Sequence, residues 1–99
     1  MSDKRIQSGL KTSSSTREIA AYLNRALDTA DLAMICQAVG DAIRLHNVAD
    51  LAKEAGLKRT SLYRAFGGRQ SPNLSTLLAV LNAMGFKLQV AEQRKRRKS

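Results

Sequence analysis

The stretch from Leu51 to Gly68 constrains the fold of this 99-residue chain more than any other part of it. It reads LAKEAGLKRTSLYRAFGG, and its apolar residues recur at helical spacing on both sides of Gly56. Gly56 is predicted to end a short helix over residues 48–55, and Gly67-Gly68 to end a second helix over 59–66. Two short helices joined by a tight turn that contains glycine form the helix-turn-helix unit.

The sequence on either side predicts three further helices. Their apolar residues again follow helical spacing, with a capping box from Ser15 to Glu18 and an N-cap at Asp31. A leucine-rich stripe precedes Gly85, which is predicted to act as a C-terminal cap. These three helices are expected over residues 15–29, 31–46 and 74–84. The sequence therefore predicts one all-α domain of five helices over residues 15–91.

Both ends of the chain lack this helical pattern. Residues 1–14 are polar and rich in serine, so they are predicted to form a disordered N-terminal arm. Residues 92–99 form a basic tail, which either contacts nucleic acid or is simply a solvated run of charge.

Between the last helix and the tail, apolar and polar residues alternate. Phe86, Leu88 and Val90 are the apolar members, and the alternation predicts a short C-terminal β-strand over residues 86–90. A single strand cannot satisfy its own backbone hydrogen bonds, so it must pair with another chain. We therefore expect these three residues to form a homodimer through a two-stranded ribbon, or to accept a strand from a partner.

The charge of the chain favours a polyanionic partner. There are 17 Lys and Arg residues against 8 Asp and Glu residues, which gives a net charge of +9. The bases dominate the second half, where no acid occurs between Glu54 and Glu92. A cationic face of this kind attracts a polyphosphate and makes binding depend on salt. Double-stranded DNA is therefore the expected partner.

The second helix of the two-helix unit carries suitable residues for reading DNA. Successive helical residues turn by about 100°, so burial of Leu62 and Phe66 would aim the opposite face outward. The predicted base contacts on that face and in the first turn are Arg59, Thr60, Ser61, Tyr63 and Arg64. The predicted phosphate contacts, which would fix the register on the duplex, are Asn47, Lys58 and Arg69.

Residue patterns typical of a catalytic site are weak in this sequence. The single histidine, His46, has no carboxylate or thiol at ligand spacing, and the single cysteine, Cys36, falls on the apolar stripe of a predicted helix. We therefore expect no enzyme activity, no metal site, no cofactor and no small-molecule substrate. There is no signal peptide and no apolar run of membrane-spanning length, so a cytoplasmic location is expected.

The run LAKEAGLKRTSLYRAFGG followed by PNLSTLLAVLNAMG resembles the phage-repressor/Cro-type (XRE) helix-turn-helix family. The preceding segments TREIAAYLNRALDTAD and LHNVADLAKEAGL extend the likeness, so that residues 16–90 resemble the HigA-like addiction-module antidote proteins. The resemblance implies a lambda-repressor-like fold, repression of the chain's own operon, and neutralisation of a small RelE/HigB-like ribonuclease toxin. It also implies DNA-reading roles for the five predicted base-contact residues.

Two other functions remain open at this point. A stand-alone phage-type repressor would share the DNA-binding unit but would have no toxin gene beside it. A module that binds RNA or another protein would use its tail and helices, and would keep the two-helix unit only as a vestige. Substitution of Arg59 and Arg64 separates this last function from the others, because only a DNA reader needs them.

Overall fold

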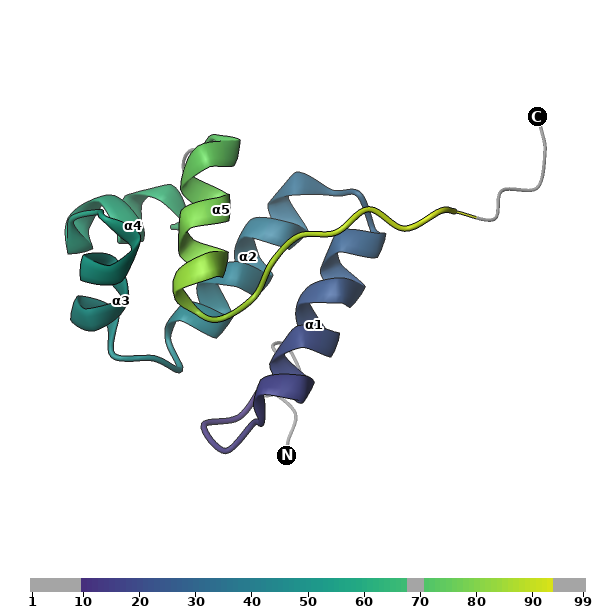
Figure 1. Cartoon of the computed structure of the whole chain (residues 1–99), viewed down its shortest axis with the longest axis horizontal. Helices are drawn as coiled ribbons and strands as arrows, with labels where there is room; N and C mark the ends of the chain where they lie inside the picture. Colours follow the sequence, from purple (N-terminus) through teal and green to yellow (C-terminus); the bar gives the residue numbers. More distant parts are fainter. Residues whose placement is uncertain (1–9, 68–70, 94–99) are drawn as a thin grey trace.

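The computed structural model describes residues 10–67 and 71–93, and its regular elements are helices (Figure 1). They are α1 (Thr16–Asp28), α2 (Leu32–Ile43), α3 (Val48–Ala55), α4 (Arg59–Ala65) and α5 (Leu74–Ala83). Within the described ranges the fold is therefore all-helical with five helices, as predicted. No helix in these ranges is both long and apolar enough to cross a membrane.

Side-chain caps fix where the first two helices begin. The Ser15 hydroxyl accepts a hydrogen bond from the Glu18 N–H at 3.1 Å, and the Glu18 carboxylate accepts one from the Ser15 N–H at 2.7 Å. This reciprocal pair is the predicted capping box of α1. The Asp31 carboxylate caps α2 in a simpler way, by accepting a hydrogen bond from the Ala33 N–H at 3.0 Å. The predicted starts of α1 and α2 are thus confirmed.

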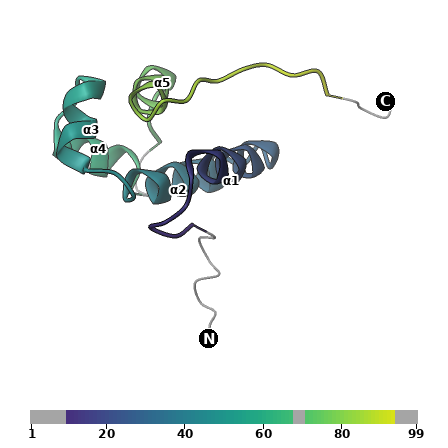
Figure 2. The same cartoon turned by 60° about the horizontal axis from the view of Figure 1, so that its bottom comes forward.

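Helices α1 and α2 form a layer, and α3 and α4 form a second group beyond one end of it. Figure 2 shows α1 and α2 side by side, α5 on one face of this layer, and α3 with α4 beyond it; α3 contacts both α4 and α5. The core between them is apolar, and Leu62 and Val80 have no solvent exposure at all. Its buried residues are Ile19, Leu23, Cys36, Ala38, Val39, Ala42, Ile43, Leu51, Ala52, Leu62, Phe66, Val80, Leu81 and Met84.

The helix α2 approaches the end of α4 closely at Gly40, which is buried. A Cβ atom at this position would lie 3.2 Å from the carbonyl oxygen of Phe66, the residue that directly follows α4. This distance is shorter than ordinary van der Waals contact, so a side chain at position 40 would require Phe66 to shift by a few tenths of an ångström. Glycine at position 40 therefore sets how closely α4 sits on α2.

A polar contact joins α1 to α2. The Tyr22 hydroxyl donates a hydrogen bond to Asp41 Oδ2 at 2.8 Å. The other carboxylate oxygen, Oδ1, accepts a hydrogen bond from Arg44 at 2.9 Å, and this pair is also a salt bridge. Because the Asp41 side chain is only 12% exposed, its two oxygens need these partners.

The segment after α5 differs from the prediction. The C-terminal cap of α5 is as expected: Gly85 has φ 91°, its N–H donates to the Asn82 carbonyl, and the Phe86 N–H donates to the Leu81 carbonyl. Residues 86–93 then run on without regular structure. The predicted β-strand over 86–90 is wrong for the described chain, because Phe86 and Leu88 pack against this chain's own core. Their alternation with polar residues reflects one half-buried side of an unpaired segment.

The predicted arm and tail fall largely outside the described residues. Of the arm, residues 10–14 are described: the Ser14 N–H donates to the Lys11 carbonyl at 2.9 Å, and Leu10 packs against the core. Of the basic tail, residues 92 and 93 are described, and they are exposed.

Candidate functional site

Gly56 determines how α3 leads into α4. Its φ of 76° lies in the left-handed region, which ends α3 without strain because glycine has no Cβ. The N–H of Gly56 donates to the Lys53 carbonyl at 3.1 Å, and the N–H of Leu57 donates to the Ala52 carbonyl at 2.8 Å. These two bonds close the end of α3, and α4 begins at Arg59 after only a short turn.

Burial of one side of α4 decides which residues face outward. Leu62 is completely buried and Phe66 is 7% exposed, so this side of α4 is fixed against the core. The opposite side carries the four exposed residues Arg59, Thr60, Tyr63 and Arg64. Ser61, the fifth predicted base contact, is half-buried at the edge of this face. The predicted contact residues thus lie together on one short helix, with Ser61 the least accessible.

The three predicted phosphate contacts have different surroundings. Lys58 is exposed and precedes α4, where its side chain makes no capping hydrogen bond. Asn47 caps α3, because its side-chain oxygen accepts the Asp50 N–H at 3.1 Å, so its amide NH₂ remains to contact a ligand. Arg69 lies outside the described residues.

The surface of α4 is cationic. It carries Arg59 and Arg64, is preceded by Lys58, and contains no acidic residue. Within residues 10–67 and 71–93, none of these three cations takes part in a salt bridge. The neighbouring helix α3 carries two exposed acids and one exposed lysine. We define the α4 surface as Lys58, Arg59, Thr60, Tyr63 and Arg64; its donors and charges suit an anionic partner with polar edges.

The single histidine and cysteine serve the fold. His46 Nδ1 lies 3.0 Å from the Ala42 carbonyl oxygen, so the ring is tied to the end of α2. Cys36 is buried, and this burial raises the pKa of its thiol, which disfavours the reactive thiolate. In the described part of the chain, no cluster of three or more His, Cys, Asp or Glu side chains could hold a metal ion.

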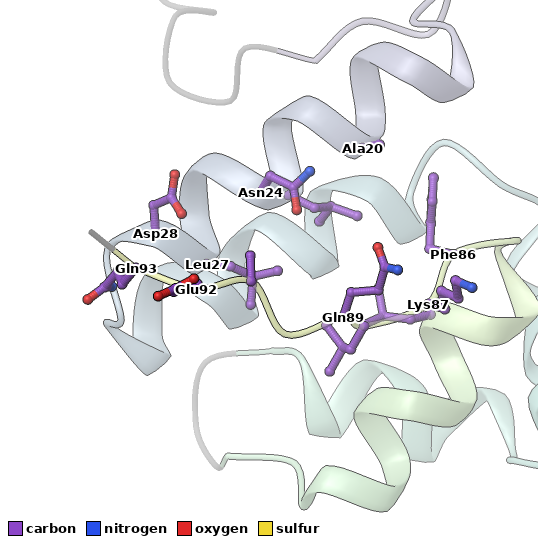
Figure 3. Close-up of a pocket in the computed structure, with 13 residues that line it drawn as sticks. Ala20, Asn24, Leu27, Asp28, Phe86, Lys87, Gln89, Glu92 and Gln93 are labelled. Atoms are coloured by element: carbon purple, nitrogen blue, oxygen red, sulfur yellow. The ribbon is translucent and has the colours of Figure 1, made fainter. Parts of the chain in front are cut away.

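A second surface, which the sequence did not reveal, lies between α1 and the segment after α5. Figure 3 shows a groove there, with a volume of about 590 Å³. We call it the α1 groove. Its lining consists of Ala20, Leu23, Asn24, Leu27, Asp28, Leu81, Phe86, Lys87, Leu88, Gln89, Ala91, Glu92 and Gln93.

The residues predicted to form a dimer strand divide between the core and the solvent. Phe86 and Leu88 line the α1 groove, whereas Val90 is fully exposed. The alternation of residues 86–90 was the only sequence signal for this region, and it could not show that the segment lies beside α1. The two walls of the groove are far apart in sequence and meet only through the fold.

Comparisons with known proteins match nearly the whole region that contains the five helices. A family described as "Probable addiction module antidote protein" matches residues 8–92. A protein of Haemophilus influenzae described as uncharacterized is 35% identical over 80 residues, which are 81% of this chain and 82% of the relative. No solved structure matches the chain significantly. Because the family match covers all five helices and the segment after them, this chain belongs to the family of probable addiction module antidote proteins.

Proposed function

We propose that this chain is a sequence-specific DNA-binding repressor of its own operon and the antitoxin of a type II toxin–antitoxin module. The observation that carries the DNA-binding half is the α4 surface, where four exposed polar or charged residues project from a helix whose other side is buried, and the exposed Lys58 directly precedes them. The family supports the antitoxin half, because an antidote protein implies a toxin.

The α4 surface has the chemistry that duplex recognition needs. Arginine can donate two hydrogen bonds to O6 and N7 of guanine, and threonine can contact a base edge or a thymine methyl group. Arg59 and Thr60 lie in the first turn of α4, which in a helix-turn-helix of the lambda-repressor-like (XRE) type enters the major groove. Lys58 and the amide of Asn47 would then contact phosphates and fix the register.

Direct measurement of DNA binding tests the DNA-binding half of the proposal. The DNA upstream of the chain's own gene is compared with a shuffled duplex of equal length by fluorescence anisotropy at several salt concentrations. We expect Arg59→Ala with Arg64→Ala to abolish the preference for the upstream DNA. The matched control is Arg17→Ala with Arg25→Ala, which removes the same charge from exposed positions of α1 and should keep the preference. Equal binding of both duplexes by the unaltered chain would refute the proposal.

The partner in the second half is a toxin of the RelE/HigB-like ribonuclease type, encoded beside this chain. We expect the two proteins to form a stable complex when they are co-expressed, and the chain to relieve the growth arrest that the toxin alone causes. We further propose that the chain acts as a cytoplasmic homodimer on a palindromic operator. Because residues 86–90 form no strand in the described chain, the residues of the dimer contact are left open by this proposal. Absence of any adjacent protein that binds the chain would reduce the function to that of a stand-alone repressor.

A further inference from the structure

The α1 groove has an apolar floor and a charged rim. Leu23 and Leu27 of α1 and Leu81 of α5 line its inner part. Asp28 and Glu92 lie at one end of the groove, and Lys87 lies towards the other (Figure 3). Among the described residues, neither Asp28 nor Glu92 takes part in a salt bridge. Within the described residues these two carboxylates therefore have no ion-pair partner beside an apolar groove, although the chain carries a net charge of +9.

The position of Asp28 is unfavourable for the isolated fold. It is the last residue of α1, where the partial negative charge of the helix end repels a carboxylate. Arg25 lies in the same final turn, yet it forms no salt bridge with Asp28. A cation bound in the groove near Asp28 would offset this repulsion.

The other wall of the groove is an unpaired segment. Residues 86–93 have no regular structure, and beyond Phe86 no backbone hydrogen bond from them is found within the described chain. Phe86 and Leu88 anchor the segment on the core, while Gln89 and Gln93 line the groove with polar side chains. Amide side chains of this kind can hydrogen-bond a peptide backbone that lies in the groove.

We propose that the α1 groove is the docking surface for the toxin, and that it takes a toxin segment in which lysine or arginine flanks an apolar side chain. The apolar side chain would pack on the leucine floor, and the cation would pair with Asp28 and Glu92. This inference rests on the antitoxin function proposed above, and it adds the surface and the chemistry of the segment that binds.

The charges of the two surfaces favour a cationic occupant of the groove over DNA. Carboxylates at the rim repel phosphates, whereas the cationic α4 surface attracts them. The groove is lined by α1 and the segment after α5, and Figure 1 shows α1 at the opposite side of the molecule from α3 and α4. A cationic protein segment is therefore the occupant whose charge is complementary to this rim.

A paired charge-removal experiment on the full-length chain tests the proposal. The test variant is Asp28→Asn with Glu92→Gln, and the matched control is Asp50→Asn with Glu54→Gln, which removes two exposed carboxylates from α3. Each chain carries an affinity tag and is co-expressed with the protein encoded by the adjacent reading frame, and the dissociation of the purified complex is measured. We expect the test variant to release its partner about tenfold faster, as loss of two rim ion pairs implies. The control should behave as the unaltered chain.

A defined peptide probe locates the surface independently. The ¹⁵N-labelled chain is titrated with a hexapeptide of alternating lysine and leucine, and with one of alternating glutamate and leucine. We expect amide shifts on residues 23–28 and 86–93 with the first peptide only, and a loss of these shifts in the test variant. Because Asn at position 28 relieves the repulsion at the end of α1, unfolding would not explain that loss.

The outcomes separate this inference from the proposed function. Equal partner release by the test variant and the unaltered chain would overturn the docking surface and leave the antitoxin function standing. Failure of the unaltered chain to capture any partner would overturn both. A test variant that changes only the self-association of the chain, or only its affinity for DNA, would assign the groove to a second copy or to DNA and would also overturn the inference.

Discussion

The contact between Gly40 and Phe66 predicts that Gly40→Ala destabilises the protein, whereas helix propensity alone predicts that it stabilises the protein. Alanine is favoured over glycine inside a helix by about 1 kcal/mol. Gly40 lies in the interior of α2, so propensity by itself predicts that Gly40→Ala stabilises the protein. The new Cβ, however, would lie 3.2 Å from the Phe66 carbonyl oxygen and 3.8 Å from the Phe66 Cβ. These two effects oppose each other, and the packing around Phe66 decides which is larger.

We expect the steric effect to be the larger one. The nearest atom belongs to the backbone, which cannot rotate away as a side chain would, and Phe66 is 7% exposed in the core. Overpacking of a well-filled core costs about 1–3 kcal/mol, so the net change is a loss of about 1 kcal/mol after the gain of about 1 kcal/mol from propensity. For a domain of this size, that loss lowers the melting temperature by about 4–8 °C. Gly40→Val, with a larger side chain, should lose more.

Thermal and urea unfolding, followed by circular dichroism, measure this effect. The comparison of Gln37→Ala with Gln37→Gly, at an exposed position inside the same helix, gives the propensity difference without the contact. If α4 moves away to make room, operator affinity should also fall, because α4 carries the proposed reading residues. A Gly40→Ala variant that melts higher than the unaltered chain, by the amount that the position 37 pair predicts, would refute the reasoning.

Three further substitutions have expected results. Asn73→Ala removes the side chain that accepts the Thr76 N–H at 2.8 Å and caps α5, so it should lower the unfolding free energy by about 1 kcal/mol in urea titrations. Tyr22→Phe removes the hydrogen bond to Asp41 and should cost about 1 kcal/mol, whereas Tyr22→Phe in an Asp41→Asn background should cost less. Burial raises the pKa of the Cys36 thiol above its usual value of 9.0, so the thiol contributes stability that is present below pH 9.0 and is lost as pH rises through the folded-state pKa. Cys36→Ala should therefore flatten the alkaline side of the stability profile, and an unchanged profile would contradict this assignment.

The features that the sequence predicted correctly depend on neighbours close in the chain. The capping box of α1 involves Ser15 and Glu18 alone, and the ends of α3 and α5 depend on Gly56 and Gly85. Each of these signals arises within one or two helical turns, so it can be recognised without knowledge of the tertiary fold. The face of α4 could be predicted as well, because burial of Leu62 and Phe66 determines what remains outside.

The features that the sequence did not predict depend on contacts between distant segments. Alternation at Phe86, Leu88 and Val90 shows that one side of the segment is buried, but it does not show what covers that side. A β-strand on a partner and a segment packed on the core of its own chain produce the same pattern. The α1 groove and the approach of Gly40 to Phe66 likewise have no local signal, because both join parts of the chain that only the fold brings together.

The separation of the α4 surface from the α1 groove limits how a bound toxin could change the affinity for DNA. The α4 surface and the α1 groove share no residue, and α3 with α4 lies at the opposite side of the molecule from α1, which lines the groove (Figure 1). Under the two proposals above, a toxin bound in the groove would not cover the residues that read DNA. Any effect of the toxin on operator binding would then require either a change in the packing of α4 on α2 or contact between the toxin and the DNA. The first route passes through Gly40, which lies close to Phe66 at the end of α4, so a substitution there should alter the effect of the toxin on DNA affinity. The second route should not depend on position 40.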